Sequence, residues 1–83
     1  MSKLQLQVGD VFYIERINEV RIITNVSVDK VQYEAYTLIG GKWEMLFCNE
    51  LESDTFLFLF GECKVPKLRA IILKSLIKGV EYV

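Results

Sequence analysis

Few side chains in this sequence belong to the types that carry out catalysis. The 83 residues include no histidine, so the commonest general base and metal ligand is missing. Cys48 and Cys63 are too few, and too far apart in the chain, to build a cysteine-rich zinc site. No base is evident beside Cys48, which we expect to be a half-buried thiol on a strand. The sequence therefore predicts no catalytic, cofactor-binding or metal-binding residue, and no enzyme.

Three carboxylates, Glu50, Glu52 and Asp54, cluster in the stretch Asn49–Thr55, which we predict to be a polar connection. Such a group could bind a cation or mimic the charges of a phosphate backbone. A calcium loop needs a more specific ligand pattern than this one. The sequence favours a solvated loop.

The C-terminal part of the chain is basic, whereas the rest is acidic. Residues 64–83 hold five Lys and Arg against one acidic residue, a balance of +4, and residues 1–63 hold five against ten, a balance of −5. The five cations are Lys64, Lys67, Arg69, Lys74 and Lys78. They could contact nucleic-acid phosphates or an acidic partner. The alternative, which the sequence favours, is the solvated face of a helix.

Five runs of alternating or continuous apolar character predict strands. They are Val11–Glu15, Val20–Val26, Val31–Leu38, Lys42–Cys48 and Phe56–Phe60. The Gly40-Gly41 pair predicts a hairpin between the third and fourth runs. We expect a three-residue loop, Ile39–Gly41, over the two-residue loop that pairs Leu38 with Trp43, because the longer loop makes one face apolar. It pairs Thr37 with Trp43, Ala35 with Met45 and Tyr33 with Phe47.

This register places Tyr33 and Trp43 in the core and Tyr36 on the opposite face. Tyr36 is therefore the aromatic side chain best suited to an exposed contact. In the run Phe56–Phe60, alternation separates the phenylalanines from Leu57 and Leu59. If the phenylalanines fill the core, the two leucines need a cover of their own.

Two covers would satisfy that requirement: a second copy of the chain, or a C-terminal helix at about residues 66–79. Pro66 suits the first turn of such a helix and Gly79 its end. Its apolar side chains, Leu68, Ile71, Ile72 and Leu76, recur at helical spacing, and Lys67, Lys74 and Lys78 fall mostly elsewhere. We predict an amphipathic helix with these apolar residues on the sheet. The β-branched pair Ile71-Ile72 leaves a strand open.

Together these elements predict a single domain, residues 1–83. Its fold class is mainly β with one C-terminal helix, either a small five-stranded curled antiparallel sheet or an SH3-like barrel. We expect a cytoplasmic protein without a membrane partner. Two cysteines fit a reducing compartment, polar residues interrupt the N-terminus, and no apolar run approaches the roughly 20 residues of a membrane span.

The function expected from these features is non-enzymatic protein–protein interaction, as in a small regulator or inhibitor of bacterial or phage type. Hydrophobic residues make up 52% of the chain, more than a small core hides. The partner is another protein or a second copy. The alternative is a nucleic-acid-binding accessory protein that uses the basic segment and an exposed aromatic side chain. The candidate partner-binding residues are Tyr36, Leu57, Leu59, Lys67, Lys74 and Lys78.

Overall fold

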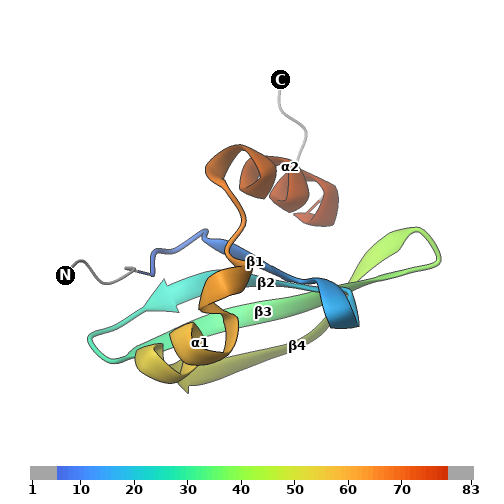
Figure 1. Ribbon diagram of the computed structural model, residues 1–83. Helices are drawn as coiled ribbons and strands as arrows, with labels where there is room; N and C mark the ends of the chain where they lie inside the picture. Colours follow the sequence, from blue (N-terminus) through green and yellow to red (C-terminus); the bar gives the residue numbers. More distant parts are fainter. Residues whose placement is uncertain (1–5, 79–83) are drawn as a thin grey trace.

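The computed structural model describes residues 6–78, which form four antiparallel strands and two α-helices (Figure 1). The strands are β1 (Val11–Ile14), β2 (Glu19–Val26), β3 (Lys30–Ile39) and β4 (Lys42–Glu52). The helices are α1 (Ser53–Phe60) and α2 (Lys67–Lys78), and two short 3-10 turns are η1 (Glu15–Ile17) and η2 (Gly61–Cys63). The strand order is β1-β2-β3-β4 in a curled, unclosed sheet. The mainly β class with a C-terminal helix is confirmed, whereas five strands and a barrel are not.

The β3–β4 hairpin turns on two glycines, and the predicted register is wrong. Gly40 and Gly41 have φ angles of 57° and 81°, the left-handed backbone that a two-residue hairpin loop requires. Leu38 therefore pairs with Trp43. A bulge follows, because Tyr36 pairs with Met45 but Ala35 pairs with Phe47. The bulge returns Phe47 to the face of Tyr33, and their ring centroids lie 6.3 Å apart.

The predicted strand Phe56–Phe60 is wrong, because this segment lies in α1. The predicted polar connection Asn49–Thr55 is wrong as well, since β4 continues to Glu52 and α1 begins at Ser53. Phe56 and Phe60 are four residues apart and therefore share one face of a helix. Both are buried, whereas Phe58, on the opposite side, is 88% exposed. Helical spacing thus selects two of the three phenylalanines for the core.

The two faces of the sheet have separate cores, one under each helix (Figure 1). Alternation along β1 sends Phe12 to one face and Val11 to the other. The α1-side core contains Phe12, Ile14, Ile23, Val31, Tyr33, Phe56 and Phe60. The α2-side core contains Val11, Val20, Ile22, Tyr36, Val65 and Ala70. The burial predicted for Tyr33 is confirmed, and Trp43 is half-buried beside the α2-side core.

A buried arginine completes the α1 side. Arg21 is 9% exposed, and its Nη2 lies 3.0 Å from Oε1 of Glu19. Its guanidinium carbon lies 4.3 Å from the ring centroid of Phe60. Such a stacked cation is stabilised by the ring faces. Arg21 therefore ties β2 to the end of α1.

Helix α2 forms within the predicted range but packs on the sheet by a different face. Its predicted end at Gly79 lies outside the described residues. Ala70 is buried, and Leu73 and Ile77 pack beside it on the α2-side core. The side chains predicted to face the sheet, Leu68, Ile71, Ile72 and Leu76, are exposed instead. Within residues 6–78, no helix is long and apolar enough to cross a membrane.

Candidate functional site

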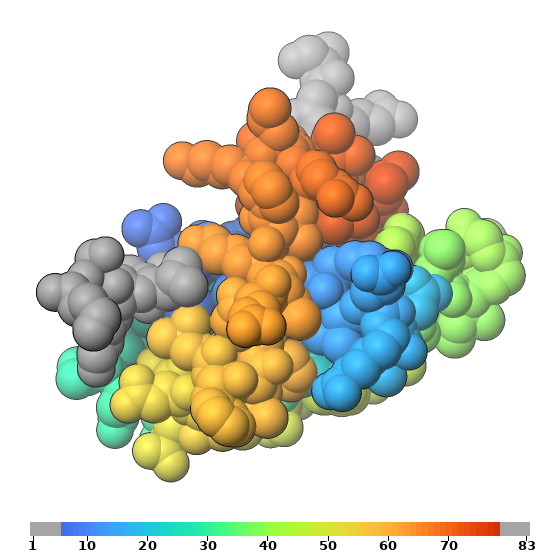
Figure 2. Space-filling model, viewed as in Figure 1, coloured from blue at the N-terminus to red at the C-terminus, as the bar shows by residue number. Residues whose placement is uncertain are grey.

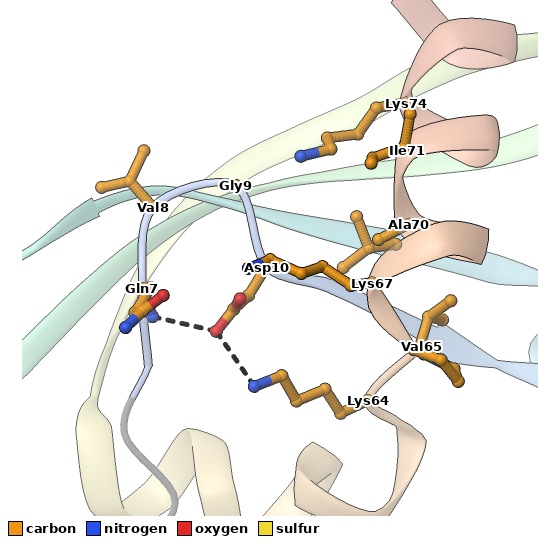
Figure 3. A pocket seen from close by; sticks show the side chains of 12 residues that line it. Gln7, Val8, Gly9, Asp10, Lys64, Val65, Lys67, Ala70, Ile71 and Lys74 are labelled. Atoms are coloured by element: carbon orange, nitrogen blue, oxygen red, sulfur yellow. Dashed lines mark hydrogen bonds and ion pairs between the residues drawn. The ribbon is translucent and has the colours of Figure 1, made fainter.

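A basic cleft of about 710 Å³ lies between the turn Gln7–Asp10 and the first half of α2 (Figure 3). Three lysines line it: Lys64, Lys67 and Lys74. The acidic residue in its lining is Asp10. Figure 3 shows Lys67 and Lys74 projecting from α2 toward the turn. We call this feature the basic cleft.

The wall opposite α2 is fixed by hydrogen bonds of the turn. The backbone N–H of Gln7 donates to Oδ2 of Asp10 at 2.9 Å, and the N–H of Gly9 donates to the carbonyl of Ile23 at 2.8 Å. Gly9 has a φ angle of 92°, which favours glycine. A Cβ there would lie 3.2 Å from Nζ of Lys74, so the glycine also lets this ammonium group approach the turn.

The lysines of the cleft differ in their pairing. Nζ of Lys64 lies 3.5 Å from Oδ2 of Asp10, which offsets one positive charge. Lys67 and Lys74 form no ion pair with any residue between 6 and 78. The cleft therefore retains positive charge suited to an anionic group.

The other end of α2 is fastened to the sheet by a polar cluster. Nζ of Lys78 donates to Oε1 of Glu34 at 2.7 Å and to the Tyr36 hydroxyl at 2.7 Å. That hydroxyl donates to Oε1 of Glu34 at 2.8 Å. The hydrogen bond from Lys78 lowers the pKa of Glu34, and the same bond raises the pKa of Lys78. Burial raises the pKa of the Tyr36 phenol.

This cluster corrects one prediction. Tyr36 is 5% exposed, so the expectation that it forms an exposed contact is wrong. Its face of the sheet is covered because α2 packs there, which the strand pattern alone does not show. Lys78 serves the same internal cluster, whereas Lys67 and Lys74 come together in the basic cleft.

The outer side of α2 carries four exposed aliphatic side chains, which we call the apolar stripe. Leu68, Ile71, Ile72 and Leu76 are 77%, 43%, 59% and 62% exposed. They stand at positions i, i+3, i+4 and i+8, so they share one side of the helix. A shallow hollow of about 180 Å³ lies among Ile71, Ile72, Ser75 and Leu76. Figure 2 shows α2 projecting from the body of the molecule. Ile71 lines both this hollow and the basic cleft.

Sequence reasoning missed this stripe as a site because it assigned the same residues to the core. A signal was available in the spacing of Ala70, Leu73 and Ile77, which form a second apolar line at i, i+3 and i+7. A helix that is apolar on two sides has one side left over once it docks on a sheet.

The predicted leucines lie on the far side of the sheet from α2. Leu57 is half-buried on α1, and Leu59 is 52% exposed. Of the two predicted covers, the one by Leu68, Ile72 and Leu76 is wrong, because α1 and α2 pack on opposite faces, and the one by a second copy stays a prediction. The six candidate residues therefore do not form one site.

The remaining chemistry-bearing groups are dispersed. Glu50 and Glu52 lie on β4 and Asp54 lies in the first turn of α1. Cys48 is exposed rather than half-buried, and Cys63 is half-buried near α1. Among residues 6–78 no group of three or more His, Cys, Asp or Glu side chains is placed to hold a metal ion.

Comparison with known proteins adds no relative: no family model, curated protein or solved structure matches this chain.

Proposed function

We propose that this protein acts by binding another protein, without catalysis, through the apolar stripe of α2. The observation that carries this proposal is the exposure of four large aliphatic side chains on a helix whose opposite face is already docked. Contiguous exposed apolar groups of this kind are typical of interaction surfaces. Full burial of one such side chain contributes about 1.5–3 kcal/mol, so covering the stripe would drive association.

Other exposed apolar side chains support the choice of α2 by contrast. Met45, Leu46 and Phe47 are 51%, 45% and 39% exposed on the edge strand β4. The bulge in that strand and its charged residues, among them Glu44 and Glu50, are devices that protect sheet edges from pairing. Helix α2 has no such protection on its outer side.

The test compares two triple variants, each of which replaces three exposed aliphatic side chains by serine. L68S/I72S/L76S (the stripe variant) removes three of the four stripe side chains. V28S/L38S/I39S (the loop variant) removes three exposed apolar side chains elsewhere, one in the β2–β3 loop and two at the end of β3, next to the β3–β4 loop. Each form is cross-linked to its neighbours in the source cell. We then select the proteins that cross-link to wild type and to the loop variant but not to the stripe variant. These proteins are purified and tested for a defined complex with each form. We expect at least one to form a stoichiometric complex that the stripe variant weakens by about tenfold or more. Equal binding by all three forms would contradict the proposal.

A second candidate function, nucleic-acid binding, is favoured by the basic cleft. Each phosphate contact made by Lys67 or Lys74 would add about one unit to the slope of log affinity against log salt. A slope of several units with DNA or RNA that falls by about 2 in K67Q/K74Q would establish this function in place of the first.

A further inference from the structure

We infer that the partner presents an amphipathic helix with acidic residues along one edge, its apolar side on the stripe and its carboxylates in the basic cleft. This inference rests on the proposed function and adds the chemistry of the partner. Its basis is that the two features are continuous through Ile71, which lines both.

The charge around the stripe has one sign. Residues 64–78 contain five cations and no acidic residue. At 100° per residue, Lys67 and Lys74 border one edge of the stripe and Arg69 borders the other. Asp10 pairs with Lys64 and Glu34 with Lys78, which leaves Lys67 and Lys74 on the cleft side of the stripe and Arg69 on its other side as the cations that an approaching carboxylate would meet.

A second copy docked stripe to stripe fits this pattern poorly. A two-fold pair of α2 helices would bring eight cations together at one interface, twice the four that each α2 carries. Like charges across an interface oppose association, and opposite charges favour it. Charge complementarity therefore points to a different chain with acidic flanks.

Shape favours a protein segment over an anionic lipid surface. Lys67 and Lys74 lie in a concave cleft whose far wall is the turn Gln7–Asp10, where Val8 is 64% exposed. A flat layer of headgroups would rest on that rim and on the stripe. Side chains on one edge of a helix can instead enter the cleft while its apolar side covers about 12 Å of α2, from Leu68 to Leu76.

The test uses two synthetic helical peptides of about 16 residues with an identical leucine stripe and either Glu or Lys along one edge. Both are titrated against the full chain by fluorescence anisotropy, alongside vesicles of phosphatidylcholine with phosphatidylglycerol. At low salt we expect the Glu peptide to bind about tenfold more tightly than the Lys peptide. K67Q/K74Q should remove most of this difference. The control R16Q/K30Q, which lowers the charge of the chain equally at exposed sites on other elements, should preserve it.

Each other outcome has one meaning. Equal binding of the two peptides, lost in L68S/I72S/L76S, would overturn the acidic partner while leaving the proposed function standing. If neither peptide binds with a dissociation constant below about 1 mM, the acidic amphipathic helix is also overturned as the partner. The cross-linking comparison then tests the proposed function separately. Tighter binding to the vesicles than to the Glu peptide would assign the surface to lipid. Sedimentation that shows a dimer, dispersed by the stripe variant, would assign it to a second copy.

Discussion

The two helices cover opposite faces of one sheet, yet they do so in different ways. Helix α1 inserts Phe56 and Phe60, and the ring centroid of Phe56 lies 4.9 Å from that of Phe12 and 5.0 Å from that of Phe60. Helix α2 buries one side chain of its own, Ala70, among the described residues and leaves four large aliphatic side chains, those of the apolar stripe, exposed. The comparison teaches that the side toward α1 is built for stability, whereas α2 is docked lightly and keeps a face for contact.

The largest effect is expected on the α1 side. Phe56→Ala removes a fully buried ring and should lower the free energy of unfolding by about 3–5 kcal/mol, which approaches the whole stability of a small domain. Urea unfolding measures the loss. Phe58→Ala is the matched control, because the same truncation at an 88% exposed position should change the free energy by less than about 0.5 kcal/mol. Equal losses would contradict the placement of α1.

A smaller effect is expected where α2 meets the sheet. Leu73 is half-buried beside the α2-side core, so Leu73→Ala should cost about 1–2 kcal/mol. Leu68→Ala on the outer side of the same helix is the control and should cost less than about 0.5 kcal/mol. If Leu68→Ala proves the more destabilising change by urea unfolding, α2 docks by the face that the sequence pattern first suggested.

The polar cluster at the end of α2 predicts a modest pH dependence. Because the pKa of Glu34 is lowered in the folded state, Glu34 stabilises the fold above the ordinary carboxyl pKa of 4.5. This stabilisation is lost as the pH falls through the pKa of the folded state. Because the pKa of Lys78 is raised in the folded state, Lys78 stabilises the fold fully at pH values below its ordinary pKa of 10.5. This stabilisation is lost as the pH rises through the pKa of the folded state. Because Lys78 is 41% exposed, solvent limits the pair to less than about 1 kcal/mol.

Glu34→Gln should therefore lower the melting temperature slightly at pH 7 and have less effect in acid, where wild type has lost the same contribution. Thermal unfolding followed by circular dichroism from about pH 2 to pH 7 measures this. Glu44→Gln removes an exposed carboxylate that makes no ion pair within residues 6–78 and serves as the control. A wild-type advantage over Glu34→Gln that stays constant to the lowest pH would contradict the pairing.

The smallest effect on stability is expected at the apolar stripe. L68S/I72S/L76S changes side chains that are mostly in water, so the free energy of unfolding should move by less than about 1 kcal/mol in total. The same variant should lose partner binding. Loss of folding instead would show that these side chains are covered within the chain.

Part of this structure could be predicted from the sequence. Alternation in the first four runs gave the strands, and Pro66 with the helical spacing after it gave α2. The run Phe56–Phe60 fits the two-residue repeat of a strand as well as the spacing of a helix, because every residue in it is apolar. In the structure, β4 passes directly into α1, and the run is helical. The hairpin register was missed because a bulge, which no spacing encodes, restores the apolar face after a two-residue turn.

The candidate site was less predictable for a related reason. Lys67 and Lys74 could be named from charge alone, but their shared cleft depends on the turn at Gly9, more than fifty residues earlier in the chain. The two apolar sides of α2 are nearly equal in residue type. Which one docks depends on the fit of a small residue, Ala70, against the sheet, and this fit is a property of the folded packing.

The measurement that tests this account most directly is the solvent accessibility of single methyl groups in α2. A soluble paramagnetic agent, added to the full chain with labelled Ile and Leu methyl groups, relaxes those that face water. We predict strong relaxation of Leu68, Ile72 and Leu76 and weak relaxation of Leu73 and Ile77, at every protein concentration. The reverse pattern would show that α2 buries the stripe against its own sheet, and the proposed contact surface would not exist.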